Sequence, residues 1–396
     1  MIGILQTIPM LRSDRIFVWA AMPMSPAALL LALSITGGVA SGQAAGATES
    51  KALMSEQFFK NIQVLKGIPV NEFMATMGFF SASLGYSCEN CHDGNTWENY
   101  ISDAPAKKRR ARGMVAMVNT INKNFFAGRQ VVTCYSCHHG VNQPRITPDL
   151  TALYSSPAEE PTDIVNPAGA GPTADQIFAQ YAQAIGGAQK FATLTSYVAK
   201  GTSAGYGLGV DKDPTEIYAK ATGERATIVH GATGVSSNSY DGREAWMAGP
   251  QIAGPNLQVP ALSLVGEDLE GARVDGLLFF PGRAKQAVAQ WKAGTPTEID
   301  DNDVQVVQGI SAGGEIVTLY FDAETHLLTR SVRYTNSPVG RIPTRVDYSD
   351  YRAVAGVKMP FKWTATWLDG RQTFELTDVQ PNAAIDAVRF GKPPAR

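Results

Sequence analysis

The hydrophobic positions follow two different patterns along the chain. In the first part, apolar residues recur every three or four positions, the spacing that predicts amphipathic helices. Two such stripes are Phe73, Met77, Phe80 and Leu84, and then Met114, Met117, Val118 and Ile121. In the last part, short β-branched and aromatic runs alternate with turn pairs, which predicts strands joined by hairpins. The clearest turn pairs are Asp241-Gly242, Gly313-Gly314 and Asp369-Gly370.

A stretch rich in Pro, Ala, Gly and Ser, with no apolar period, separates the two patterns and is typical of a linker. We therefore predict a helical domain over residues 45–148, a linker over 149–172 and a β-rich domain over 173–396. In the β-rich domain we expect about ten or eleven strands, a number that fits one large curved antiparallel sheet or open barrel. Helices are predicted over 173–194, before the strands, and over 283–294.

Residues 1–44 are predicted to be a secretory signal peptide. Two arginines precede a mostly apolar run, Ile16 to Ala40, and small residues suitable for cleavage follow it. The alternative is a retained membrane anchor. However, Pro23 and Pro26 interrupt the run, and its continuous apolar part is shorter than the roughly 20 residues that a spanning helix needs. We therefore expect an exported protein in the periplasm.

Length and charge narrow the class of protein further. The 396 residues are enough for two domains that each bury a core. The net charge is -2 and 18% of the residues are charged, so the basic excess of nucleic-acid binders is missing. We expect no nucleic-acid partner.

All four cysteines lie in two copies of the motif Cys-x-x-Cys-His, read as "SCENCHDG" from residue 87 and "TCYSCHHG" from residue 133. The spacing places two thiols about one helical turn apart, where both can form thioethers with one haem, and sets an imidazole beside them to bind the iron. We therefore predict two covalently bound haems c. The predicted residues are Cys88, Cys91 and the proximal ligand His92 for the first haem, and Cys134, Cys137 and the proximal ligand His138 for the second.

Two other interpretations of the cysteines fit the pattern less well. For a four-cysteine zinc site, the interval between Cys91 and Cys134 is far longer than in most zinc ribbons, and zinc does not require a histidine after each pair. Disulfides are the usual expectation for an exported protein, but a bridge within each pair would be strained by its short loop. The adjacent histidines favour haem.

The second ligand of each iron is predicted to be a methionine. Two histidines at each iron would require four, and only three remain in the helical part, because His230 and His326 lie among the strand signals of the β-rich domain. Two Met-x-x-Met pairs, Met74 with Met77 and Met114 with Met117, lie on the predicted helices before the motifs; Asn71 is predicted to cap the first helix. Methionine ligates haem iron and raises its reduction potential. From these residues alone, either methionine of a pair can be the ligand, and core filling by both is the alternative.

Residues of about 55 to 150 resemble the multihaem cytochrome c subunit of bacterial photosynthetic reaction centres. The resemblance is carried by "NIQVLKGIPVNEFMATM" with "CENCH", and by "RARGMVAMVNTIN" with "VVTCYSCHHG". It implies that Met77 and Met114 are the axial ligands and that Met74 and Met117 pack beside them. It also implies electron donation to a photo-oxidised reaction centre or, in a non-phototroph, service in another periplasmic respiratory chain. The family has four haems, so two motifs cover half of its pattern.

A basic cluster, "KKRRAR", occupies residues 107–112 directly before the Met114 helix. Cations at a helix N-terminus oppose the helix dipole, so compensating contacts are expected. The cluster is suited to haem propionates or to an acidic partner surface, and the alternative is a solvated turn. His139 stands where the family usually has Arg, and we expect it at the surface or near a propionate.

Residues of about 172 to 394 resemble periplasmic domains of the outer-membrane lipoprotein-carrier type. Fragments such as "YAQAIGGAQKFATLTSYVAKGT" and "TRVDYSDYRAVAGVKMPFKW" carry this resemblance. It implies a curved antiparallel sheet around an apolar pocket and makes a hydrophobic ligand a candidate partner. Two alternatives to an electron carrier stay open: a dihaem peroxidase-type enzyme, and a hydrophobic-ligand binding protein supplied with electrons by the cytochrome part. An electron carrier without catalytic residues is favoured, because the sequence offers no distal histidine for a peroxidase.

Overall fold

The computed structural model describes residues 51–92, 101–104, 106–144, 146–147, 165–205, 211–249 and 260–393. The predicted signal peptide and most of the predicted linker lie outside the described residues, and the predicted domain boundaries stay predictions. Residues Glu49–Arg396 form one compact unit. Within the described ranges, no helix is both long enough and apolar enough to cross a membrane.

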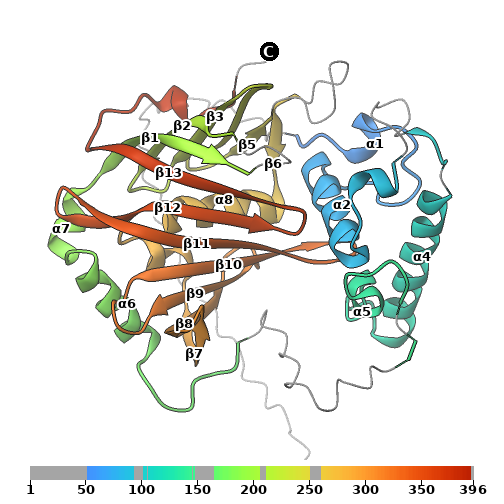
Figure 1. Ribbon diagram of the computed structural model, residues 1–396, viewed down its shortest axis with the longest axis horizontal. Helices are drawn as coiled ribbons and strands as arrows, with labels where there is room; N and C mark the ends of the chain where they lie inside the picture. Colours follow the sequence, from blue (N-terminus) through green and yellow to red (C-terminus); the bar gives the residue numbers. More distant parts are fainter. Residues whose placement is uncertain are drawn as a thin grey trace, which may run out of the picture. The chain divides into compact units, whose positions relative to one another are not determined.

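The first part of this unit is helical, as predicted (Figure 1). Its elements are α1 (Ser55–Phe58), α2 (Val70–Leu84), the 3-10 turn η1 (Cys88–Asn90), α4 (Lys107–Phe125) and α5 (Cys134–His138). Helix α2 ends at Gly85, whose φ of 65° is a left-handed conformation that glycine adopts at little cost. The predicted cap is wrong. Because α2 begins at Val70, Asn71 lies inside its first turn, and its side chain hydrogen-bonds Asp268 instead.

Among the described residues, thirteen strands form one sheet, so the predicted large open sheet is confirmed. The strand order is β6-β5-β4-β3-β2-β1-β13-β12-β11-β10-β9-β8-β7, and in the described chain the edge strands β6 and β7 are not neighbours, which leaves the sheet open. Neighbouring strands are antiparallel. The bounds are β1 (Ser196–Ala204), β2 (Asp213–Lys220), β3 (Arg225–Gly231), β4 (Gly234–Tyr240), β5 (Ala245–Ala248), β6 (Leu262–Leu264), β7 (Trp291–Ile299), β8 (Asn302–Ile310), β9 (Ile316–Asp322), β10 (Leu328–Ser337), β11 (Gly340–Val354), β12 (Val357–Trp367) and β13 (Gly370–Pro381).

The three turn pairs join strands as predicted. Asp241-Gly242 lies between β4 and β5, Gly313-Gly314 between β8 and β9, and Asp369-Gly370 between β12 and β13. The expected ten or eleven strands is too few, because β5 and β6 are too short for an alternating pattern to be recognised.

Helices pack on the sheet at two places in the sequence. The helix predicted over 173–194 is confirmed as α6 (Ala174–Ala184) and α7 (Ala188–Thr193), separated at Gly186-Gly187. The helix predicted over 283–294 is wrong: the chain there forms the 3-10 turn η3 (Ala284–Ala287) and then enters β7. A longer helix, α8 (Gly266–Leu278), precedes it. The sequence pattern did not predict α8, because glycines lower its helix propensity. Gly276 is required, since a Cβ there would lie 2.1 Å from the carbonyl oxygen of Gly223.

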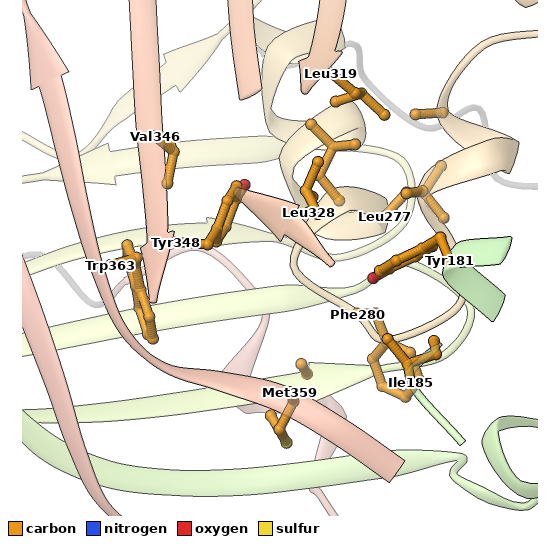
Figure 2. Close-up of a cluster of buried hydrophobic side chains, with 14 of the residues drawn as sticks. Tyr181, Ile185, Leu277, Phe280, Leu319, Leu328, Val346, Tyr348, Met359 and Trp363 are labelled. Carbon is orange, nitrogen blue, oxygen red and sulfur yellow. The ribbon is translucent and has the colours of Figure 1, made fainter. Parts of the chain in front are cut away.

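The core of the sheet region lies between the sheet and helices α6 and α8 (Figure 2). Aromatic rings fill much of it. Phe279 packs against Tyr348 and Trp363 at ring-centroid distances of 5.5 Å and 5.4 Å, and Tyr181 packs against Phe321 at 5.2 Å. Such offset and edge-to-face pairs stabilise a core beyond the area that they bury.

Candidate haem-binding sites

The second cysteine motif folds as one capped helical turn. Thr133 is the N-cap of α5, and its hydroxyl accepts a hydrogen bond from the Ser136 backbone N–H at 3.3 Å. In return the Ser136 hydroxyl accepts from the Thr133 N–H at 3.0 Å. This reciprocal capping satisfies two N–H groups that the helix cannot pair itself. It fixes the turn on which Cys134 and Cys137 are placed.

The first motif forms a similar turn, although η1 is assigned as 3-10 helix. The Ser87 N–H donates to the Asn90 side-chain oxygen at 2.8 Å, and the His92 N–H donates to the Cys88 carbonyl at 2.9 Å. Sequence reasoning missed these capping residues. The signal was present, since a Ser or Thr lies before each motif and a polar side chain follows three residues later.

The two motif histidines, His92 and His138, differ in what favours metal binding by their imidazole rings. The Nδ1 of His138 lies 3.1 Å from the Val141 carbonyl oxygen, which accepts its hydrogen bond when Nδ1 is protonated and leaves Nε2 to bind a metal. His92 is half-buried, and burial, aided by the nearby Lys108 charge, lowers its pKa to about 4. Its imidazole is therefore neutral at physiological pH, the form that ligates metals.

The four cysteines are free thiols in two separate pairs. Cys134 is buried and Cys91 half-buried, and burial raises the pKa of both thiols, whereas Cys88 and Cys137 are exposed. Among the described residues, no three His, Cys, Asp or Glu side chains come together as a metal cluster. The arrangement is therefore not that of one four-cysteine zinc site.

The methionines of the second segment lie on an exposed apolar stripe of α4. The buried face of this helix carries Val115, Val118 and Asn122. Met114 and Met117 lie beside that face and are 39% and 45% exposed, and Phe125 continues the stripe at 76% exposure. Apolar side chains gathered in this way indicate a binding surface. They are not the core filling that the alternative interpretation requires.

Helix α2 shows the same division into two faces. Its most buried side chains are Thr76, Phe79 and Ser83, which pack into the protein. Met77 is half-buried, as are the other members of the stripe that the sequence indicated, Phe73, Phe80 and Leu84. The methionine stripe of α2 is therefore also incompletely covered by the described protein.

The two haem segments pack on each other at glycines. The Gly140 N–H, two residues after His138, donates to the Ser83 carbonyl near the end of α2 at 3.0 Å. A Cβ at Gly85 would lie 2.3 Å from the Gly140 carbonyl oxygen, so this contact requires a glycine. The first methionine helix thus supports the chain that leaves the second motif.

Asn122 is a further positioning residue that the sequence did not reveal. Its buried side chain accepts hydrogen bonds from the N–H groups of Val131 and Val132, at 3.1 Å and 2.9 Å, and donates to the Val132 carbonyl at 2.7 Å. These bonds hold the chain directly before the capped turn of the second motif. Nothing in the sequence distinguishes Asn122 from the solvent-exposed Asn119 and Asn124 of the same helix.

The basic cluster occupies the first turns of α4, and its charges are partly compensated, as expected. Arg112 forms an ion pair with Asp103 at 2.7 Å, and the Lys107 ammonium lies 4.8 Å from the centre of the Tyr86 ring. Arg109 and Arg110 are exposed. His139 is also exposed; it ends α5 in the left-handed conformation, and its ring lies against Tyr135.

These residues fit a covalently attached haem at each motif. Two thiols lie on one capped turn, a neutral or oriented imidazole follows, and a half-exposed methionine stripe lies on the preceding helix. This set defines a c-type cytochrome segment.

Comparison with known proteins also finds a similarity to cytochrome c subunits. Residues 34–167 match the family model of the photosynthetic reaction centre cytochrome C subunit. A reaction centre cytochrome c subunit from Thermochromatium tepidum is 35% identical over 103 residues, which cover 25% of this chain and 25% of that protein. The chain thus matches about a quarter of the length of this curated relative. The region matched by the family model contains both Cys-x-x-Cys-His motifs.

Two solved structures show a partial likeness to this chain. A LolA superfamily protein from Nitrosomonas europaea is 15% identical with a TM-score of 0.38, over 56% of this chain and 99% of that one. A DUF1329 family protein from Desulfovibrio piger is 9% identical with a TM-score of 0.36, over 55% of this chain and 96% of that one.

The resemblance of the sheet region to lipoprotein carriers predicts an apolar pocket. A cavity lined by Tyr181, Leu278, Tyr348, Lys358 and other residues has a volume of about 10 Å³. A cavity of this size holds about one water molecule. The hydrophobic ligand expected there stays a prediction, and this cavity does not support it.

Proposed function

We propose that the protein is an exported dihaem c-type cytochrome that carries single electrons in the periplasm. The observation that carries the proposal is the repeated arrangement of a capped Cys-x-x-Cys-His turn behind a helix whose methionines are half-buried on α2 and exposed on α4. The match of residues 34–167 to the reaction centre cytochrome subunit supports it. The N-terminal apolar run supports export.

Each haem would be held by four side chains. The proposed sets are Cys88, Cys91, His92 and Met77 for haem 1, and Cys134, Cys137, His138 and Met114 for haem 2. Bound haem supplies reversible one-electron exchange at its iron. The Val141 carbonyl would fix the orientation of the His138 ring for metal binding, and the methionine sulfurs would supply the second protein ligand of each iron.

The proposed redox partner is a membrane reaction centre in a phototroph or a respiratory complex in another organism. The exposed guanidinium groups of Arg109 and Arg110, on the helix that carries Met114, favour a partner with an acidic surface. Replacing both with Glu should lower the association rate and its dependence on salt, without altering the haem spectrum.

A redox titration of the exported chain tests how many electrons the protein exchanges. We expect two one-electron components, one of which disappears in Cys88→Ser/Cys91→Ser and the other in Cys134→Ser/Cys137→Ser. A chain without redox-active absorbance would contradict the proposal. Carbon monoxide binding to the reduced protein would instead indicate an open iron face, as the peroxidase-type alternative requires.

The axial ligands are tested by matched methionine variants. Met77→Ala and Met114→Ala should each weaken the Met-to-ferric-iron band in the near infrared and lower one reduction potential. Met74→Ala and Met117→Ala, one helical turn away, are the controls and should keep both bands. An inverted pattern would assign the ligand role to the other methionine of the pair.

A further inference from the structure

Side chains from the sheet region complete the small core beneath the haem segments. This core contains Phe79 of α2, Val115 of α4 and Cys134 of α5, and also Val339 and Ile342 from the β10–β11 hairpin. All five are buried. Cys134 therefore shares one apolar cluster with residues some 200 positions away in the sequence, and the end of the hairpin lies beside α2 (Figure 1).

Close contacts fix the hairpin turn against these helices. A Cβ at Gly340 would lie 2.3 Å from the Phe79 ring, so the ring packs directly on the backbone of the turn. Close to this contact, the Gln130 side chain donates to the Ser337 carbonyl at 3.0 Å. A Cβ at Gly78 would lie 2.9 Å from the Asp369 carboxyl carbon, so the β12–β13 turn also packs closely against α2.

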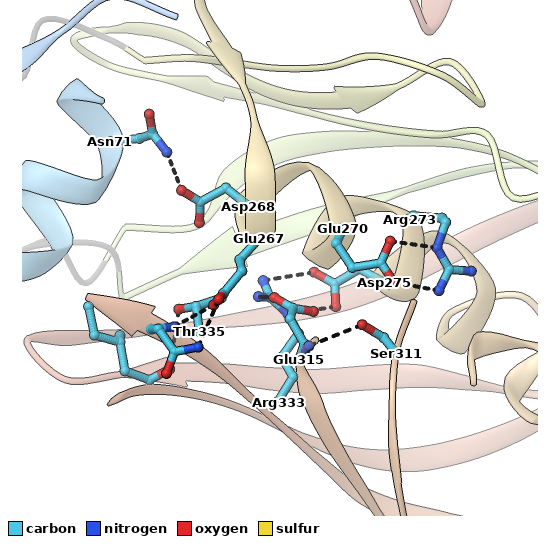
Figure 3. A network of polar contacts seen from close by, with 12 residues as sticks. Asn71, Glu267, Asp268, Glu270, Arg273, Asp275, Ser311, Glu315, Arg333 and Thr335 are labelled. Atoms are coloured by element: carbon cyan, nitrogen blue, oxygen red, sulfur yellow. Dashed lines mark hydrogen bonds and ion pairs between the residues drawn. The ribbon is translucent and has the colours of Figure 1, made fainter. Parts of the chain in front are cut away.

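A polar network holds the sheet side of this contact in place (Figure 3). At the start of α8, Asp268 accepts a hydrogen bond from Asn71 of α2, and Glu267 accepts one from the Asn336 side chain of β10 at 2.7 Å. Further along α8, Asp275 forms an ion pair with Arg333 of β10 at 3.1 Å. Helix α8 thus ties the end of β10, directly before the hairpin turn, to the helix that carries Met77.

We propose that the β10–β11 turn, through Val339, Gly340 and Ile342, is a positioning element for the second haem motif. The inference rests on the proposed function of that motif. Cys134 is the buried member of its cysteine pair, whereas Tyr135, Ser136 and Cys137 of α5 are exposed. The turn that carries both thiols and His138 is therefore anchored in the protein through Cys134, which belongs to the same apolar cluster as Val339 and Ile342.

The test compares two valine truncations in the full-length exported chain. Val339→Ala removes the hairpin contact, and Val306→Ala is the control, because Val306 is equally buried but lies in a separate apolar cluster of the sheet. We expect Val339→Ala to shift the reduction potential of one haem and to change its near-infrared methionine band. Val306→Ala should shift neither. Equal effects of both variants, or no effect of Val339→Ala, would overturn the proposal.

Amide hydrogen exchange of the haem-free chain separates this inference from the proposed function. We expect exchange in residues 131–141 to accelerate about tenfold in Val339→Ala, the factor that a loss of about 1.4 kcal/mol produces. Val306→Ala should leave these amides unchanged. If the wild-type chain acquires no haem but this difference appears, the proposed function fails and the positioning contact stands. If two haems are attached but the difference is absent, the positioning role fails alone.

Discussion

The haem segments and the sheet region differ in how completely their apolar side chains are buried. The sheet covers its core with its own helices, and Phe280, Phe321 and Leu328 are almost fully buried there. The haem segments leave Met114, Met117 and Phe125 exposed on α4. This difference is the one expected if the sheet region folds on its own side chains and the haem segments also pack against the proposed haems.

This difference has an energetic consequence. Fully burying a large apolar side chain contributes about 1.5–3 kcal/mol to stability. Covering the exposed stripe of α4 would therefore stabilise the folded helix by several kcal/mol. A group that binds only the folded segment adds its binding free energy to the stability of that segment. Haem attachment should therefore stabilise the helices far more than the sheet.

The largest effect is expected when haem attachment is withheld. In a chain made without haem, amides of α4 and α5 should exchange at least about a thousandfold faster than in the haem-bound chain, equivalent to about 4 kcal/mol. Amides of β8, β9 and β12 should keep their protection, because their packing involves no haem contact. Equal loss of protection in both regions would contradict the expected difference between them.

The contact between the two regions gives the next largest effect. Phe79→Ala should destabilise the protein by about 4 kcal/mol, as for other buried aromatic truncations. Gly340→Ala should also destabilise it, because the new Cβ meets the Phe79 ring. In the double variant the clash is absent, so the two losses should not add, and a double-mutant cycle of urea unfolding measures the coupling. Additive losses would show that the two residues do not touch.

A smaller, pH-dependent effect is confined to the sheet region. Glu315 is fully buried, and burial, outweighing the attraction of Arg333 at 3.4 Å, raises its pKa from 4.5 to about 8. Between these values the folded chain holds a proton that the unfolded chain has released, so stability falls as the pH rises from about 4.5 to about 8. Glu315→Gln removes this loss.

Glu315→Gln should therefore be more stable than wild type by about 4 kcal/mol at pH 8 and nearly equal to it at pH 4.5, and the difference should level off about one pH unit above 8. Thermal unfolding across this range measures the change. Asp347→Asn, at a half-exposed ion pair with Arg330, is the control. A gain at pH 8 no greater than at pH 4.5 would show that Glu315 is ionised in the folded protein.

What the sequence could predict depended on local signals. The two cysteine motifs, the methionine stripes and the three hairpin turns are each defined within a few residues, and the sheet followed from repeated short β-branched runs. Helix α8 was missed because Gly271 and Gly276, which lower helix propensity, are there to allow close contacts with Arg333 and Gly223. Those contacts exist only in the folded chain.

The positioning contacts were unpredictable for a related reason. From the sequence alone, Asn71 has the features of a helix cap, but in the folded chain its side chain hydrogen-bonds Asp268. Likewise, Val339 is an ordinary turn residue in the sequence, and its contact with the core around Cys134 depends on how α2 and the hairpin meet. Spacing alone predicts the cysteines and histidines of the two motifs as haem ligands, whereas the residues that orient their turns could not be predicted from the sequence.

The most direct test of the account is the native mass of the full-length exported chain. We predict a polypeptide that carries two covalent haems, with one haem lost in Cys88→Ser/Cys91→Ser and one in Cys134→Ser/Cys137→Ser. A chain that carries no covalent haem, or whose haem content is unchanged in both double variants, would contradict the account.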